Sequence, residues 1–211
     1  MFETASIPDT MHFNGPMVHP VRGPGARAGR ASFSAAEGAV DHHFAGRADM
    51  SEYSAKIFWS RGDEAFVDNQ FSRRHEWEFD GGAKVRASSS PDILPEPMSD
   101  GTAVDPEEAL VAALSSCHML WFLTIAAARK YVVESYRDEP IGIMEHVGGR
   151  KRAITRVTLR PHVRFGAGRE PTMAELEAMH AKANENCFIA NSIKATVTCI
   201  PTLQSPGMEN P

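Results

Sequence analysis

The sequence predicts an α+β fold in which one or two antiparallel sheets pack on two helices. Two observations lead to this prediction. Hydrophobic patterns with strand and helix periods follow one another in the order strands, helix, strands, helix, strand. The sequence also lacks the glycine patterns that mark dinucleotide-binding and P-loop folds. Its 211 residues are enough for one domain with its own core and an appendage.

The first fifty residues are the predicted appendage. Residues 1–50 are rich in Gly, Pro, Ala and Arg and show neither hydrophobic period, so we expect a poorly ordered extension. Regular patterning begins just after Met50, which makes that methionine a candidate start of the functional polypeptide. We place the domain at residues 51–204 and a short tail at residues 205–211. The histidines of the extension are expected to be solvated rather than metal ligands; they are His12, His19, His42 and His43.

The domain is expected to begin with an antiparallel sheet. Residues 52–59 alternate between apolar and polar side chains, as do residues 75–79, and both stretches are predicted strands. The sequence Asp-Gly-Gly at residues 80–82 is a hairpin signal that leads into a third strand at residues 84–87. Residues 88–104 contain three prolines and are predicted to form a loop.

Residues 105–131 predict a central, buried helix. Asp105 suits the N-cap, and Pro106 fits the first helical position, where a missing N–H costs nothing. Two glutamates then place negative charge against the positive end of the helix dipole. The helix body is apolar on all faces, which is typical of a buried helix. Cys117 lies in this body and is by default a small core side chain.

Strands and a second helix are expected to follow. Residues 132–145 and 153–165 are predicted strands, and Pro161 indicates an edge or a bulge in the second one. A capping box at residues 172–175 opens a helix whose apolar residues recur at helical spacing. A last strand is predicted at residues 196–202.

Composition narrows the classes of partner. The net charge is −5, and no basic patch is interleaved with aromatic residues, so no nucleic acid is expected as a partner. We find no run long and apolar enough to span a membrane and no secretory signal, which predicts a cytoplasmic protein without a membrane partner. Three cysteines without a CxxC pair do not form a disulfide scaffold.

Two of the three cysteines, Cys117 and Cys187, are candidates for chemistry, and Cys199 is not. Glu107 precedes Cys117 by ten residues, which is about 15 Å along a helix, so only a long third side chain could link the two. Cys187 follows a predicted helix and precedes a short segment that could start another helical turn, an environment that lowers the pKa of a thiol. Cys199 lies in a strand pattern and is expected to be a core residue. These features alone do not establish a redox pair.

Two sequence segments together resemble the OsmC/Ohr family of thiol-dependent peroxidases. The first is DPEEALVAALSSC, which ends at Cys117, and the second is ANENCFIANSIK, which contains Cys187 seventy residues later. The family shows an (N/D)PEE helix start, a cysteine ten residues beyond the first glutamate, and a second cysteine in a segment of similar type. The resemblance extends over about residues 52–203.

The resemblance implies an intertwined homodimer with two buried central helices and active sites at the subunit interface. By position, Cys117 matches the peroxidatic cysteine, Cys187 the resolving cysteine, and Glu107 the glutamate that holds a catalytic arginine. Arg73 is the preferred candidate for this arginine. Arg61 comes second and Arg74 third.

The implied activity is the reduction of organic hydroperoxides. A guanidinium would favour the reactive thiolate, and Glu107 would hold it through two parallel hydrogen bonds. The Cys117 sulfenic acid would then condense with Cys187 to a disulfide, which an external dithiol reduces without any bound cofactor or metal. An apolar wall would favour organic hydroperoxides over hydrogen peroxide; its candidate residues are Leu114, Met119, Trp121 and Phe122.

Other interpretations remain open at this point. His118 follows the cysteine where the peroxidases commonly carry an aromatic residue, and we expect it to be solvated or satisfied in the core rather than bonded to Cys117. A cysteine hydrolase or transferase would use Cys117 with a distant histidine such as His162 or His180. A zinc site built from Cys117, His118 and Cys187 is a weaker alternative. The fold could also serve as a stress-induced binding or scaffold dimer without peroxidase turnover.

Overall fold

The computed structural model describes residues 51–166 and 168–203. The described residues belong to one compact unit that starts at Ser51. The predictions for the extension at residues 1–50, for its histidines and for the tail at residues 205–211 lie outside the described residues.

The first sheet matches its prediction. Its strands are β1 (Ala55–Phe58), β2 (His75–Phe79) and β3 (Lys84–Ala87), all antiparallel in the order β1-β2-β3. The hairpin between β2 and β3 turns at Gly82, whose φ of 82° favours glycine. The register pairs Trp77 with Ile57 on one side and with Val85 on the other, so apolar side chains share one face.

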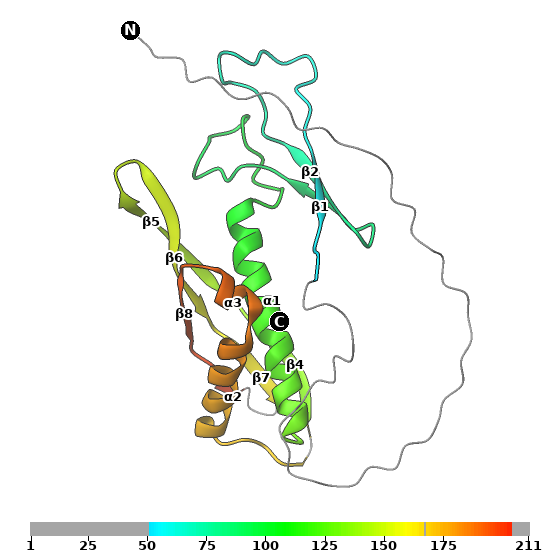
Figure 1. Cartoon of the computed structure of the whole chain (residues 1–211), viewed down its shortest axis with the longest axis vertical. Helices are drawn as coiled ribbons and strands as arrows, with labels where there is room; N and C mark the ends of the chain where they lie inside the picture. Colours follow the sequence, from blue (N-terminus) through cyan, green and yellow to red (C-terminus); the bar gives the residue numbers. More distant parts are fainter. Residues whose placement is uncertain (1–50, 167, 204–211) are drawn as a thin grey trace, which may run out of the picture. The chain divides into compact units, whose positions relative to one another are not determined.

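The central helix α1 (Pro106–Ala128) begins where its cap signals predict. The Asp105 carboxylate accepts a hydrogen bond from the backbone N–H of Glu108 at 2.8 Å, and the Glu108 side chain reaches back to the N–H of Asp105. This reciprocal pair satisfies two backbone donors that a helix start leaves free. The helix runs through the middle of the unit in Figure 1 and contacts α2, α3, β4, β5 and β6.

Each of the two long strands predicted after α1 is broken into two. The first becomes β4 (Val133–Arg137) and β5 (Ile141–Gly148), which Pro140 separates, and the second becomes β6 (Lys151–Leu159) and β7 (His162–Phe165). Pro161 lies between β6 and β7, because a proline cannot donate the hydrogen bond that continues a strand ladder. The prolines therefore distribute these strands over two sheets, β4-β7-β9 and β5-β6-β8.

The prediction that the sheets are purely antiparallel is wrong for two of the three. The last predicted strand forms β8 (Thr196–Cys199) and β9 (Thr202–Leu203), which pair in parallel with β6 and β7 respectively. Parallel pairing needs a long crossover, and the helices between β7 and β8 provide it. Hydrophobic alternation alone does not distinguish the two directions of pairing.

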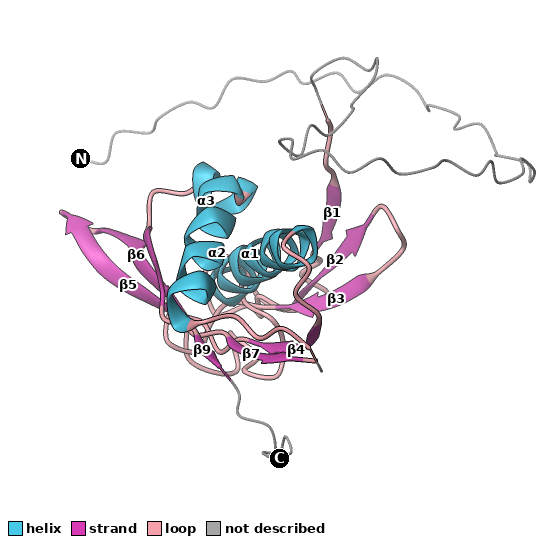
Figure 2. Ribbon diagram, turned by 90° about the horizontal axis from the view of Figure 1, so that it is seen from below, coloured by secondary structure: helices cyan, strands magenta, loops and turns pink. Residues whose placement is uncertain are grey.

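Helix α2 (Met173–Asn186) starts at the predicted capping box of Thr172 and Glu175. The short helix α3 (Phe188–Ser192) follows directly and fulfils the prediction of a further helical turn after Cys187. Figure 2 shows the three helices together, with β5 and β6 to their left and β9, β7 and β4 below them.

The core consists of two buried clusters. One contains Phe122, Leu176 and Met179 between α1 and α2, and the other contains Leu114, Leu159 and Cys187. Both clusters draw side chains from α1, which carries buried residues at Leu114, His118, Phe122 and Ala126. Spacing of four residues places these side chains on one face of the helix.

The length and composition of α1 contradict one sequence prediction. Among the described residues, α1 alone is long and apolar enough to pass as a membrane-crossing helix, although no run of this kind was expected. The difference arises because the charged residues of α1 are confined to its first turn and the rest is apolar on every face. The core helix of a fold passes the same test of length and composition.

Candidate active site

Cys117 and Cys187 lie in the same hydrophobic cluster. Cys117 is half-buried in the middle of α1, and Cys187 is fully buried where α2 ends and α3 begins. The Cys187 sulfur lies 4.0 Å from the carbonyl oxygen of Leu114 and accepts the backbone N–H of Ala190 at 3.4 Å. The structure therefore brings together two cysteines that are seventy residues apart in the sequence.

The surroundings of Cys187 disfavour the loss of its thiol proton. Burial raises the pKa of the Cys187 thiol to about 11; the N–H of Ala190 opposes this rise and the neighbouring Cys117 thiol adds to it. Cys187 therefore keeps its proton at neutral pH.

Glu107 and Arg73 line one cavity. Its volume is about 390 Å³, and its other lining residues include Trp59, Phe71 and His75. Glu107 lies in the first turn of α1, ten residues before Cys117, which corresponds to about 15 Å along the helix axis. The predicted residues therefore form two separate pairs. Glu107 and Arg73 lie near the start of α1, and Cys117 and Cys187 lie near its middle.

The three candidate arginines have different partners. The Arg73 guanidinium lies 3.7 Å from the ring centroid of Phe71 and donates to the carbonyl oxygens of Asn69, at 3.1 Å, and of Phe71. Arg74 pairs with the Asp100 carboxylate at 2.9 Å, and Arg61 donates to the backbone of Glu64. Of the three, Arg73 alone lines the cavity beside Glu107. Its catalytic role stays a prediction.

Three of the four residues predicted to form an apolar wall are divided between the two core clusters. Leu114 is fully buried in the cluster of the two cysteines, and Trp121 packs against both clusters. Phe122 belongs to the other cluster, where its ring stacks on His180 with centroids 4.1 Å apart. The surroundings of the cysteines are apolar, but Phe122 contributes to them less directly than expected.

A buried cluster of two histidines and a cysteine lies beside this site, and its composition was not predicted. His118 Nε2 and His180 Nδ1 are 2.9 Å apart, and the Cys199 sulfur lies 3.9 Å from the same His118 nitrogen. The two rings are stacked nearly parallel, at 5°. Burial lowers the pKa of His118 to about 4 and that of His180 to about 3, so both are neutral at pH 7.

The contacts of these histidines bear on three of the alternatives raised by the sequence. The expectation that His118 is solvated or satisfied in the core is met only in part, since the residue is fully buried and its Nε2 lies within hydrogen-bond distance of His180, but its Nδ1 is buried without a partner. The zinc site proposed for Cys117, His118 and Cys187 does not form, because His118 faces Cys199. His180 contacts His118, and His162 is bonded to Thr202 at 2.6 Å, so these contacts give no support to a hydrolase pair with Cys117.

Comparison with known proteins identifies relatives of this fold. The sequence profile of the OsmC-like protein family matches residues 99–201. The solved structure of an OsmC-like protein of unknown function from Vibrio cholerae is 54% identical in sequence, with a TM-score of 0.71. That match covers 72% of this chain and 100% of the other.

Two more distant structures share the fold. An organic hydroperoxide resistance protein OsmC from Legionella pneumophila is 18% identical, with a TM-score of 0.51, and the match covers 74% of this chain and 98% of the other. An organic hydroperoxide resistance protein from Elizabethkingia anophelis is 12% identical, with a TM-score of 0.54 and coverage of 73% and 96%. The comparison with curated proteins gives no match.

Proposed function

This chain belongs to the OsmC-like family, and from that premise we propose that it is a thiol-dependent peroxidase that reduces organic hydroperoxides. The observation that carries the proposal is the proximity of Cys117 and Cys187 in one apolar cluster. Two structures with this fold are named organic hydroperoxide resistance proteins, which agrees with the proposal.

The proposed reaction uses the two cysteines in sequence. The Cys117 thiolate attacks one peroxide oxygen of ROOH, the O–O bond breaks, and the alkoxide takes up a proton and leaves as ROH. Cys117 is then a sulfenic acid. The Cys187 sulfur attacks it, forming the disulfide and releasing water, and an external dithiol reduces that disulfide by thiol exchange. The high pKa of Cys187 supports its assignment to the second step rather than the first.

We propose that Arg73, which lines the cavity beside α1, supplies positive charge to the Cys117 thiolate. Arg73 would leave its contacts with Asn69, pair with Glu107 and extend toward the Cys117 sulfur, stabilising the thiolate and the developing charge on the peroxide. Glu107 would hold the guanidinium in a fixed orientation, since a buried unpaired charge costs several kcal/mol. This assignment predicts that removal of either side chain slows the first step.

We further propose that the active form is a homodimer in the cytoplasm, where dithiol reductants are available. Two sets of exposed residues support a dimer. Ile57 and Phe58 of β1 are 60% and 51% exposed, and Leu120 of α1 is 59% exposed, and a partner subunit could cover these apolar side chains. The neighbouring exposed positions of α1 are small, and these are Ala112, Ala113 and Ser116.

The proposal is tested by peroxide consumption with a dithiol reductant. The reduced full chain is compared with the variants Cys117→Ser and Cys187→Ser. The matched control is Cys199→Ser, which removes the third thiol of the chain. We expect both of the first two variants to lose dithiol-dependent turnover. Retained turnover in Cys117→Ser would contradict the proposal, whereas loss in that variant alone would indicate a one-cysteine mechanism.

A single-turnover experiment separates the peroxidase from a binding or scaffold dimer. Thiols are titrated before and after one equivalent of cumene hydroperoxide. The peroxidase loses two thiols per chain, and a binding dimer loses none. The same experiment with hydrogen peroxide tests the substrate class, because the apolar surroundings of the cysteines predict slower reaction with the smaller, more polar peroxide.

A further inference from the structure

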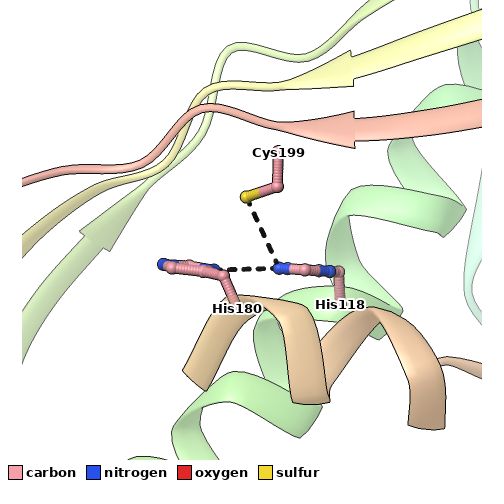
Figure 3. A group of neighbouring side chains, drawn as sticks. All are labelled: His118, His180 and Cys199. Atoms are coloured by element: carbon pink, nitrogen blue, oxygen red, sulfur yellow. Dashed lines mark hydrogen bonds between the residues drawn. The ribbon is translucent and has the colours of Figure 1, made fainter. Parts of the chain in front are cut away.

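We propose that His118, His180 and Cys199 form a buried binding site for one Zn²⁺ ion. Figure 3 shows the three side chains pointing toward one another from α1, α2 and β8. One donor atom from each residue can be chosen so that all three lie within 4.8 Å of one another. The inference concerns residues that the proposed peroxidase reaction does not use.

The distances between the donor atoms are close to those of a zinc site. With bonds of about 2.0 Å to nitrogen and 2.3 Å to sulfur, neighbouring ligands of a zinc ion lie about 3.3–3.8 Å apart. The observed separations are 2.9 Å between His118 Nε2 and His180 Nδ1 and 3.9 Å from His118 Nε2 to the Cys199 sulfur. The third separation, between His180 and the Cys199 sulfur, is at most 4.8 Å, so side-chain shifts of up to about 1 Å would admit an ion.

The core holds the donors in place. His118 is fully buried and His180 is 1% exposed, and the His180 ring is held by its stacking on Phe122. The three residues come from three elements of the fold, so their positions are fixed by tertiary packing rather than by a mobile loop. A preformed set of this kind loses little conformational entropy when an ion binds.

The electrostatic surroundings favour a divalent ion. Both imidazoles are neutral, and a zinc-bound cysteine is a thiolate, which leaves one positive charge on the ion and its ligands. The Asp138 carboxylate is close enough to influence the protonation of both His118 and Cys199. It is fixed by hydrogen bonds from the Ser115 hydroxyl, at 2.5 Å, and the backbone N–H of Arg160, at 2.6 Å.

Ion binding has a simple proton balance. Zn²⁺ displaces the proton of the Cys199 thiol and forms the zinc–sulfur bond. The ring that donates in the ion-free pair moves that proton to its outer nitrogen, which is Nδ1 for His118 or Nε2 for His180, so that the two facing nitrogens bind the ion. One proton is released for each ion bound.

The test uses Co²⁺ as a spectroscopic substitute for Zn²⁺ in the reduced full-length Cys117→Ser/Cys187→Ser variant. Cys199 is the only thiol left in this protein. We expect a thiolate-to-cobalt charge-transfer band that saturates at one equivalent, with release of one proton, and that Zn²⁺ abolishes by displacement. Histidines in residues 1–50 cannot imitate this band, because they carry no sulfur.

Further variants locate the ligands. Adding Cys199→Ser should remove the band, and adding His180→Gln should weaken Co²⁺ binding at least about tenfold. His146→Gln, at an exposed histidine of β5, is the matched control and should leave binding unchanged. If His180→Gln does not fold, Zn²⁺ should still raise the unfolding midpoint of the parent variant but not that of its Cys199→Ser derivative.

Two results would overturn the proposal. One is the absence of a charge-transfer band at stoichiometric Co²⁺ in the folded parent variant, which would leave the three residues as a hydrogen-bonded core cluster. The other is a wild-type protein whose zinc stoichiometry is unchanged by Cys199→Ser but lost in Cys117→Ser/Cys187→Ser, which would place the ion at the other two thiols. Displacement of Co²⁺ by Cu⁺ but not by Zn²⁺ would also count against the divalent assignment.

Discussion

The reactivity of Cys187 toward alkylation follows directly from its position in the core. Burial and the neighbouring Cys117 thiol raise its pKa from 9.0 to about 11, even though the N–H of Ala190 acts in the opposite direction. At pH 8 two pKa units correspond to about 100-fold less thiolate than in an unperturbed cysteine. Because the thiolate is the nucleophile, Cys187 of the folded, reduced protein should be alkylated at least about 100-fold more slowly than the same residue in urea.

The assay is iodoacetamide labelling of the full chain at a series of pH values, read by mass spectrometry of the peptide that contains Cys187. Steric protection alone slows the reaction but leaves the pH midpoint at the ordinary value. The raised pKa instead predicts a rate that still increases tenfold per pH unit above pH 9. Far-ultraviolet circular dichroism at each pH checks that the protein remains folded.

The Cys117→Ser variant is the matched control for the contact between the two thiols. It removes the sulfur that contributes to the high pKa but leaves the burial of Cys187 almost unchanged, so the pH midpoint should move toward the ordinary value without reaching it. A labelling rate that levels off near pH 9 in the wild-type protein would refute the reasoning. An unchanged midpoint in Cys117→Ser would refute the part that concerns the neighbouring thiol.

Three further predictions concern stability. Gly142→Ala places a Cβ atom 2.6 Å from Cγ2 of Val111 and should destabilise the fold by about 1–3 kcal/mol in a urea titration. Adding Val111→Ala to the same chain should relieve most of this cost. Additive losses of stability in the double variant would contradict the steric explanation. Asp105→Ala removes the N-cap of α1 and should cost about 1 kcal/mol by the same titration, with Asp105→Asn nearly neutral. Hydrogen bonds from Thr102 lower the pKa of Asp100 from 3.8 to about 2, so the stability they provide is complete above pH 4 and is lost as the pH falls toward 2. Acid titration of Asp100→Asn should lack this component, and an identical acid profile would contradict the assignment.

The sequence was most informative where a signal is local. The capping residues of α1 and α2 mark both helix starts correctly, since each cap needs only residues three positions apart. The glycines at residues 81 and 82 likewise predict the hairpin of the first sheet. The pairing of Cys117 with Cys187 could be anticipated only through the family resemblance, because nothing in the spacing of the two cysteines brings them together.

The features that were missed depend on contacts between distant residues. In the sequence, His118 is 62 positions from His180 and 81 positions from Cys199. Each of the three alone looks like an ordinary residue of a helix or strand. Parallel pairing of β8 was missed for the same reason, since alternation gives the exposed face of a strand and not its neighbour. His118 and His180 both occupy apolar helical positions, and this shared feature is the one signal that could have drawn attention to the pair.

The parallel pairing of β6 with β8 has a consequence for the order in which the chain is made. About 37 residues separate the end of β6 at Leu159 from the start of β8 at Thr196, and a ribosome needs about 2–7 s to add them. During that interval one edge of β6 exposes unpaired backbone groups, which other strands can bind. Because α2, α3 and β8 all follow β6 along the chain, this edge of β6 is covered only when the last part of the domain has been made.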